Sequence, residues 1–301
     1  MTAVTDRSAQ VAERAAVTSA RDRRRRGGRP KMSGFDRMAT AVVVAFGLLW
    51  LVPLLWALDT SFKPETETTR LPLTWMIENP TLEAYLGVIN STDIVLWYGN
   101  SLFISCMVSG LAVLVSSMAA FALSRVPMAG KKVIFGAILL GIMIPSQALI
   151  VPLFQEMQVL GLLGTYWAVI LPQVPAAVAV FVFKQFFDGL PGALFESAQA
   201  DGAGWLRMWA TIAMPLSRPA ISAVAIFTFV WSWNALLWPL LTLNDSQLMT
   251  VTVGLATVQG EFGVAYAQIM ASAILGALPL FAVFLLFQRQ IVQGIANTGI
   301  K

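Results

Sequence analysis

The sequence predicts an all-α integral membrane protein with six transmembrane helices. Of its 301 residues, 57% are hydrophobic and 12% are charged, which is about half the charged share of an ordinary soluble domain. Six apolar runs are each long enough to cross the hydrocarbon core of a bilayer, which takes about 20 helical residues. The runs are apolar on every side, without the alternation of strands, and backbone groups in lipid need partners within their own segment. These observations favour helical spans.

The predicted spans divide the chain into two parts. Residues 1–38 form a basic cytoplasmic tail that we expect to be disordered, and residues 39–301 form the transmembrane domain. The six spans cover residues 39–58, 102–123, 133–153, 167–187, 220–241 and 269–287. Prolines interrupt several of them, which indicates kinked helices around a cavity, as in a transporter or a channel.

The distribution of basic residues predicts the orientation in the membrane. All 20 Lys and Arg residues except Lys63 and Arg70 fall in the tail, near the connections after the second and fourth spans, or at the C-terminus. The positive-inside rule therefore predicts cytoplasmic termini in a multi-pass protein of the cell membrane. The tail could also be a nucleic-acid arm or a twin-arginine signal. We favour a tail beside anionic lipid headgroups and expect no nucleic-acid partner.

The residue types argue against catalysis by this chain. The sequence has no histidine and a single cysteine, Cys106. Histidine-based zinc motifs and Ser-His-Asp triads are therefore excluded, and one cysteine cannot build a cysteine-cluster metal site. The G-x-x-x-x-G-K-[ST] phosphate loop of nucleotide-binding proteins is also missing from the sequence. We expect no enzyme activity, no metal site and no cofactor bound by this chain.

One predicted cytoplasmic connection, residues 188–219 between the fourth and fifth spans, is much longer than the others. Pro191 suits the first turn of a short helix, and Gly202 can adopt the positive φ that ends it. Pro215 and Pro219 are expected to end a second helix before the membrane is re-entered. Apolar residues at helical spacing give that second helix a stripe, which we expect to insert into a partner; they are Trp205, Met208, Trp209 and Ile212.

The same segment resembles the "EAA" signature of binding-protein-dependent ABC importer permeases. The matching residues are Glu196-Ser197-Ala198, Asp201-Gly202-Ala203, Trp209, Ile212 and Met214-Pro215. Ser197, Trp209 and Met214 are mild departures from the usual Ala, Phe and Leu. The remainder of the chain, from about Phe46 onward, is similar to the carbohydrate-uptake subgroup, as in the smaller permease of the maltose importer. The residues that carry this similarity include Thr60-Ser61-Phe62-Lys63, Asn100-Ser101, Ser124-Arg125, Trp233-Asn234 and Phe287-Gln288-Arg289.

The resemblance implies a division of labour between subunits. Two permease subunits would form the pathway, two P-loop ATPase subunits would bind ATP and Mg on the inner side, and an extracytoplasmic binding protein would deliver the solute. The elbow would sit in a cleft of the ATPase, where Glu196 pairs with a basic residue. Asp201 could also serve locally by capping the start of the second helix. The implied coupling residues are Glu196, Ser197, Ala198, Asp201, Gly202, Ala203, Trp205 and Trp209.

Polar and aromatic residues within the spans are candidates for the solute pathway, because polar groups in lipid are costly. They are Asn234, Trp231, Trp233, Gln147 and Gln173. The alternative is that the tryptophans form an interfacial belt and Asn234 bonds a neighbouring backbone group. Similarly, Ser101, Ser105 and Ser109 form a small-residue stripe that packs either within this subunit, which we favour, or against a partner.

The resemblance favours a sugar or a related polyhydroxy solute, and a glycerol-phosphate-type solute is the main alternative. A secondary transporter or channel would explain kinked helices but not the elbow. An intramembrane enzyme is a third possibility, which the missing histidine and the lack of paired acids within the spans disfavour.

Overall fold

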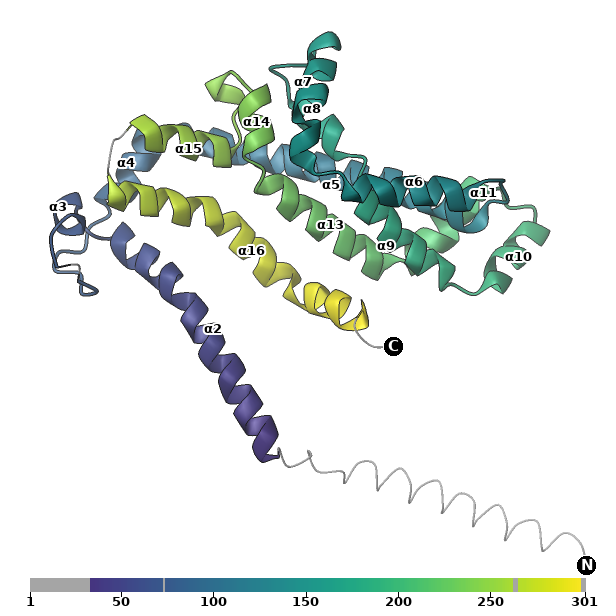
Figure 1. Ribbon diagram of the computed structural model, residues 1–301, viewed down its shortest axis with the longest axis horizontal. Helices are drawn as coiled ribbons and strands as arrows, with labels where there is room; N and C mark the ends of the chain where they lie inside the picture. Colours follow the sequence, from purple (N-terminus) through teal and green to yellow (C-terminus); the bar gives the residue numbers. More distant parts are fainter. Residues whose placement is uncertain (1–32, 73, 262–264, 299–301) are drawn as a thin grey trace, which may run out of the picture. The chain divides into compact units, whose positions relative to one another are not determined.

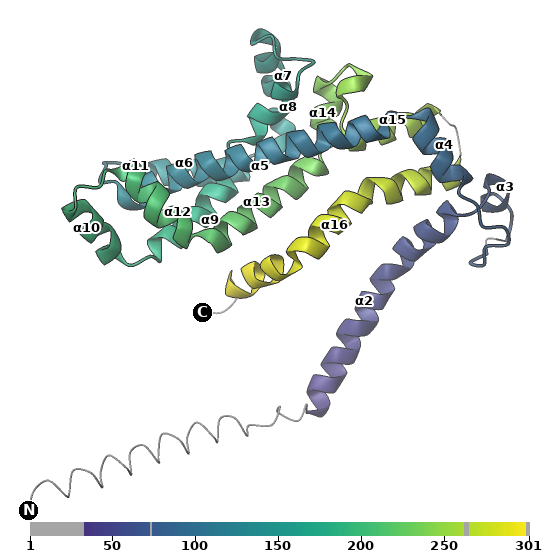
Figure 2. The same ribbon diagram turned by 180° about the vertical axis from the view of Figure 1, so that it is seen from behind.

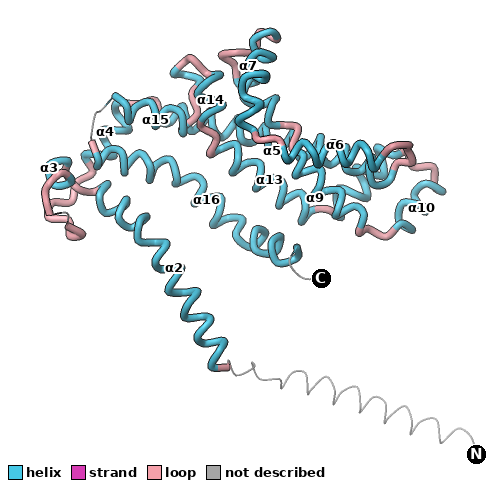
Figure 3. The backbone as a smooth tube through the Cα atoms, viewed as in Figure 1, coloured by secondary structure: helices cyan, strands magenta, loops and turns pink. Residues whose placement is uncertain are grey.

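The computed structural model describes residues 33–72, 74–261 and 265–298, and all regular structure in these ranges is helical (Figures 1 and 3). The elements are α2 (Gly34–Ser61), α3 (Glu65–Thr68), α4 (Glu83–Ser91), α5 (Ile94–Arg125), α6 (Lys131–Met143), η1 (Ser146–Leu149), α7 (Ile150–Val159), α8 (Tyr166–Ile170), η2 (Leu171–Gln173), α9 (Ala177–Asp188), α10 (Gly192–Ala200), α11 (Trp205–Met208), η3 (Trp209–Ala213), α12 (Met214–Leu216), α13 (Arg218–Trp233), α14 (Leu237–Thr242), η4 (Ser246–Leu248), α15 (Val251–Glu261) and α16 (Tyr266–Thr298).

The chain divides into two units after Leu55. In the first unit, the described residues are Ser33 and the part of α2 from Gly34 to Leu55. α2 begins at Gly34, which lies inside the range predicted as tail, and it contains the whole first predicted span. Residues 1–32 of the predicted tail lie outside the described residues.

Among the described residues, three helices are long and apolar enough to cross a membrane, and up to six spans result if each bent helix pair counts as one. The three continuous spans are α2, α5 and the part of α16 up to Gln288. They contain the first, second and sixth predicted spans. The other three predicted spans are interrupted.

The third predicted span, residues 133–153, is not one straight helix. α6 ends at Met143, and the chain turns by 97° before η1 and α7. Ile144 has an extended backbone with φ −78° and ψ 119°. It precedes Pro145, whose ring disfavours the α conformation in the preceding residue.

The fourth and fifth predicted spans are broken as well. The helical turns α8 and η2 meet α9 at 44°, across a break that contains Pro175 and an extended Ala176. In the fifth span α13 ends at Trp233, and the chain is not helical again until Leu237 begins α14. The fifth predicted span, residues 220–241, is therefore two helices.

The core of the second unit is built around α5, which packs along α13 and α9 (Figures 1 and 2). Ser101, Ser105 and Ser109 are buried, and Ser109 Oγ donates to the Ala225 carbonyl oxygen on α13 at 2.9 Å. Small side chains let the two backbones approach closely. The favoured interpretation, that this stripe packs within the chain, agrees with these contacts.

Different segments of the chain pack at the two ends of α5. α10 lies at the C-terminal end of α5, whereas α4 and α15 lie at its N-terminal end (Figures 1 and 2). The segment 188–219 and the segments that carry α4 and α15 are therefore at opposite ends of the helical core.

Candidate coupling elbow and solute cavity

The elbow is a pair of short helical segments joined by a glycine turn. α10 ends in a Schellman motif, in which the Gly202 N–H donates to the Gln199 carbonyl oxygen at 3.0 Å and the Ala203 N–H donates to the Ala198 carbonyl oxygen at 2.9 Å. Gly202 has φ +78°, so the predicted positive φ is confirmed. This conformation is strained for any residue with a Cβ.

Asp201 lies at the C-terminal end of α10 and not at the start of the second helix. It is the C-cap residue of α10, and α11 begins after Gly204, which makes no side-chain cap. The expectation that Asp201 caps the second helix is therefore wrong. Its carboxylate is exposed.

The apolar stripe of the second helix is covered by the chain itself. Met208 is 1% exposed and packs in a core cluster with Phe195, Phe187 and Phe121. The other stripe residues are partly buried against the same cluster; they are Trp205, Trp209 and Ile212. Apolar residues of α5, α9 and α10 thus cover Met208 fully and the other three stripe residues in part, and insertion of their remaining exposed surface into a partner stays a prediction.

What the elbow presents outward is a mixed polar and apolar surface. The exposed members of the predicted coupling set are Glu196, Ser197, Asp201 and Gly202, and the partly buried ones are Ala198, Ala203, Trp205 and Trp209. Leu194 and Leu206 are also exposed on this surface, although the sequence analysis did not assign them. Both leucines lie outside the apolar stripe, and this position in the sequence could have indicated that they are exposed. Within the described residues, neither Glu196 nor Asp201 forms a salt bridge.

Arg125, the last residue of α5, holds the start of the elbow. Its Nη2 donates to the carbonyl oxygens of Phe187 and, at 2.7 Å, Leu190. The guanidinium carbon lies 4.5 Å from the ring centroid of Phe195 on α10. One side chain thus ties α5 to the turn before α10 and to α10 itself. Arg125 was noted in the sequence only as part of a family pattern, and its contacts depend on tertiary structure.

The second helix of the elbow leads into α13 through a sharp bend. Helical structure runs from Trp205 to Leu216 and includes η3, a π-helical turn. The bend to α13 is 83° and lies at Ser217, which is fully buried. Pro215 and Pro219 were expected to end the second helix, and it does end between them, after Leu216. Pro215 itself lies in the first turn of α12, a position that tolerates proline.

A cavity of about 940 Å³ opens beside α13. It is lined by residues from η1, α7, α9, α13, the α13–α14 connection, α14 and α16. Three predicted pathway residues, Gln147, Trp231 and Asn234, line it together. Trp231 is 64% exposed and stacks on Phe227 with ring centroids 6.1 Å apart. The cavity therefore combines exposed aromatic rings with side-chain amides.

Asn234 bonds a neighbouring backbone group and also lines the cavity. Its Nδ2 donates to the Val230 carbonyl oxygen at 2.9 Å, and the same residue is exposed in the cavity. It is the C-cap residue of α13, so the end of the helix fixes its place. In the described part of the chain, the side-chain oxygen Oδ1 of Asn234 has no hydrogen-bond partner. It can therefore accept a hydrogen bond from a solute.

The other two predicted pathway residues lie outside the cavity. Trp233 is 3% exposed, and its ring lies 5.8 Å from that of Phe229 and 6.4 Å from that of Tyr98. Gln173 is half-buried, and its Nε2 donates to the Val169 carbonyl oxygen at 2.9 Å. Both side chains have contacts inside the protein.

At the opposite end of α5, three side chains hold the connection between α14 and α15. Trp97 Nε1 donates to the carbonyl oxygen of Ser246 at 2.8 Å, and Ser101 Oγ accepts from the Val251 N–H at 2.8 Å. Between them, Asn100 Nδ2 donates to the carbonyl oxygens of residues 247 and 249. The Asn100-Ser101 pair, noted in the sequence for its family resemblance, thus binds the backbone of a distant connection.

Within the described residues, no group of three or more acidic, cysteine or histidine side chains is placed to hold a metal ion.

The sequence profile of a family described as "binding-protein-dependent transport system inner membrane component" matches residues 112–297. The chain is similar to the arabinooligosaccharides transport system permease protein AraQ of Halalkalibacterium halodurans, with 36% identity over 83% of this chain and 90% of the relative. It is 30% identical to the sulfoquinovosyl glycerol transport system permease protein SmoH of Agrobacterium fabrum, over 88% of this chain and 92% of the relative.

A third relative is the sn-glycerol-3-phosphate transport system permease protein UgpE of Yersinia enterocolitica, with 31% identity over 88% of this chain and 97% of the relative. The fold matches a crystal structure of a bacterial ABC transporter involved in the import of the acidic polysaccharide alginate. The TM-score is 0.75, the identity is 20%, and the match covers 87% of this chain and 99% of the other. The chain therefore belongs to the inner-membrane permease family of binding-protein-dependent ABC importers, whose members are not enzymes and leave ATP hydrolysis to a separate subunit.

Proposed function

We propose that this chain forms half of the translocation pathway for an uncharged sugar or related polyhydroxy solute and is driven through its elbow by a separate ATPase. Its partners in this proposal are a second permease subunit, two P-loop ATPase subunits carrying ATP and Mg, and an extracytoplasmic solute-binding protein. Both termini and the elbow face the cytoplasm, as the placement of Lys and Arg predicts. The observation that carries the proposal is the continuous path from the exposed elbow through the 83° bend into α13, which lines the cavity.

The packing of Phe195 and Met208 supports a route by which a movement of the elbow reaches the cavity. Because Phe195 and Met208 pack into the core formed with α5 and α9, a force on the exposed face of α10 acts on the helices behind it. The second helix of the elbow joins α13 at Ser217, and α13 supplies Phe227 and Trp231 to the cavity wall. Packed helices shift as units between discrete arrangements, which is what alternating access requires.

The cavity lining supports an uncharged solute. Tryptophan rings offer flat apolar faces to a sugar ring, and the amides of Gln147 and Asn234 can exchange hydrogen bonds with hydroxyl groups. None of the described lining residues is charged, whereas sites for phosphate typically use Arg or Lys. A glycerol-phosphate-type solute is the second candidate, because one relative carries that name. It would require cationic groups from the partner permease.

Replacement of Asp201 tests the coupling role. Asp201→Lys is expected to abolish solute uptake and to release the ATPase during co-purification, while the chain stays in the membrane. Reversing a charge on a docked surface costs about 2 kcal/mol or more, roughly 30-fold in affinity. The matched control is Asp36→Lys, which reverses an exposed acid in the first turn of α2 and should leave uptake unchanged.

Two outcomes would contradict the proposal. If Asp201→Lys retained the ATPase and normal uptake, the elbow would not be the docking site. If the purified wild-type chain carried no ATPase and moved solute in vesicles without ATP, the chain would be a secondary transporter or channel.

A further inference from the structure

The segment that follows α2 is fixed by a buried lysine. Lys63 is 4% exposed; its Nζ pairs with Asp59 Oδ2 at 2.7 Å and donates to the Thr74 carbonyl oxygen. The ammonium group also lies 5.5 Å from the ring centroid of Trp56. A buried charge is stable only when it is paired and hydrogen-bonded. The Lys63 contacts therefore hold the backbone at Thr74 against the last turns of α2.

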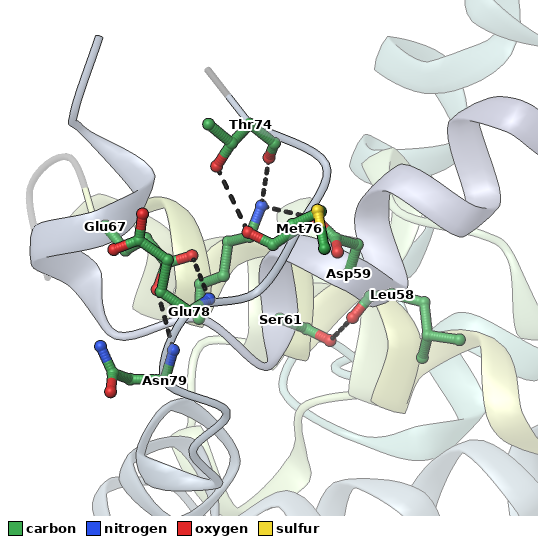
Figure 4. A network of polar contacts seen from close by, with 9 residues as sticks. Leu58, Asp59, Ser61, Glu67, Thr74, Met76, Glu78 and Asn79 are labelled. Carbon is green, nitrogen blue, oxygen red and sulfur yellow. Dashed lines mark hydrogen bonds and ion pairs between the residues drawn. The ribbon is translucent and has the colours of Figure 1, made fainter. Parts of the chain in front are cut away.

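Carboxylate contacts close the same segment on itself. Glu67 accepts from the backbone N–H of Glu78 at 3.1 Å and of Asn79 at 3.5 Å (Figure 4). The Thr81 N–H donates to the Phe62 carbonyl oxygen at 2.8 Å. These bonds join both ends of the loop, so its exposed residues have a defined position relative to the end of α2.

The loop presents apolar side chains where a polar surface would be expected. Leu71 and Met76 are each 82% exposed, and Trp75 is 53% exposed; we call these three residues the apolar triad. Trp75 packs edge-on against Trp56, with ring centroids 4.6 Å apart. Trp56 lies in the last two turns of α2, a helix apolar enough to cross a membrane. Within the described residues, Trp75 thus joins the triad's loop through Trp56 to the end of a span.

We propose that the apolar triad lies in the lipid interface at the membrane boundary where α2 ends. The occupant of this surface is lipid, because the Trp75–Trp56 contact continues the apolar surface of the span and tryptophan favours the headgroup level. Asp59 lies in the last turn of α2, and Lys63 lies just after the helix ends. These two charged residues therefore mark the end of the apolar span. The loop anchors the C-terminal end of α2 at a fixed depth, and this role is independent of which solute the importer carries.

Depth-dependent quenching tests the proposal on the full chain, purified with its partner subunits and placed in nanodiscs. Leu71→Cys and Met76→Cys are made separately on a Cys106→Ser background and labelled with an environment-sensitive fluorophore. The Cys106→Ser parent gives the background from partner subunits. We expect blue-shifted emission at both positions, strong quenching by phospholipids brominated near the headgroup, and weak quenching by aqueous iodide. The matched control is Glu83→Cys, an exposed acidic position in the first turn of α4, which should show the reverse pattern.

Three outcomes overturn the proposal. Iodide quenching at Leu71 and Met76 as strong as at Glu83 would mean that the triad faces water. Protection from both iodide and brominated lipid would mean that protein covers it, for example the solute-binding protein or the second permease. Equal lipid quenching at all three positions would mean that Leu71 and Met76 lie no deeper in the membrane than the acidic control, so the triad would not be the part of the chain that enters the lipid interface. Because nanodiscs expose both membrane faces, none of these results depends on the proposed orientation or transport function.

Discussion

Gly202 and Gly204 lie two residues apart in the elbow, yet the backbone makes different demands on them. Gly202 has φ +78°, whereas Gly204 has φ −71° and ψ 162°, a conformation open to any residue. A Cβ added at either position would meet no atom within 4 Å. The only difference between the two substitutions is therefore backbone strain, which isolates the Schellman turn as the feature under test.

Gly202→Ala is expected to weaken the elbow, and Gly204→Ala is not. Placing a Cβ in the left-handed region costs about 1–2 kcal/mol, which favours unwinding of the turn between α10 and α11. Hydrogen exchange of residues 192–203 in the purified complex should be faster in Gly202→Ala, and uptake should fall. Equal exchange in the two variants would show that the elbow does not depend on the positive φ.

Arg125 is a second single residue on which the elbow depends. Its guanidinium group donates to two carbonyl oxygens and contacts an aromatic ring. Charged hydrogen bonds and cation–π contacts together contribute about 2 kcal/mol or more. Arg125→Ala is expected to increase proteolysis between α9 and α10 and to reduce the amount of co-purified ATPase. Arg125→Lys should recover little of this, since an ammonium cannot keep the forked geometry and the stacking.

The control for this pair is Lys132→Ala, which removes a nearby basic residue that is exposed. It should behave as wild type. If Arg125→Lys also behaved as wild type, a positive charge alone would suffice and the forked contact would not matter.

At the scale of elements, α15 is held against α5 by a close approach that only glycine permits. A Cβ built on Gly254 would lie 2.2 Å from the ring of Trp97. Trp97 cannot easily withdraw, because its Nε1 is bonded to the Ser246 carbonyl oxygen. Asn100 and Ser101 bind the same connection from the same helix. The glycine and the polar contacts therefore fix α15 on α5 together.

Gly254→Ala is expected to destabilise the packing of α15 by about 1–3 kcal/mol, as overpacked substitutions do. A lower thermal transition temperature of the purified complex is the measurement. Gly136→Ala on α6, where a Cβ would meet nothing within 4 Å, should leave that temperature unchanged or raise it. A Gly254→Ala protein as stable as wild type would show that α15 can move away from Trp97 at little cost.

At the scale of the whole molecule, the cavity depends on segments that are far apart in the sequence. Gln147 comes from the turn after α6, Asn234 from the end of α13, and Phe284 from α16. The breaks at Pro145 and after Trp233 place polar side chains at helix ends, where backbone constraints hold them. A cavity of this kind needs all of these helices in place.

Asn234→Leu is expected to raise the apparent KM for solute uptake while the subunits remain assembled. Loss of one neutral hydrogen bond of about 1 kcal/mol corresponds to roughly fivefold. Asn244→Leu provides the control, because Asn244 is an exposed asparagine outside the cavity lining. An unchanged KM in Asn234→Leu would place the solute contacts elsewhere, for example on the second permease.

Local features of the sequence were enough for much of the architecture. The apolar runs predicted helices because hydropathy and backbone satisfaction are properties of each segment alone. Gly202 predicted the end of α10 because positive φ is a local demand of the chain. The prolines indicated that spans would be interrupted, although the 97° turn at Pro145 could not be read from the sequence. The family could also be predicted from the sequence, because the residues of the elbow motif have a fixed spacing.

The tertiary structure decided which partner each apolar face received. Transfer of an apolar side chain out of water is favourable whether lipid, another subunit or the same chain covers it. The sequence of the stripe that contains Trp205 and Met208 therefore could not predict which of these surfaces packs against it. For the same reason the sequence could not separate Trp233, which is buried, from Trp231, which is exposed in the cavity. The contacts of Arg125 and the meeting of Gln147 with Asn234 depend on long-range packing. Composition and local motifs determined the kind of protein and its helices, whereas packing alone determined which faces meet and which remain open.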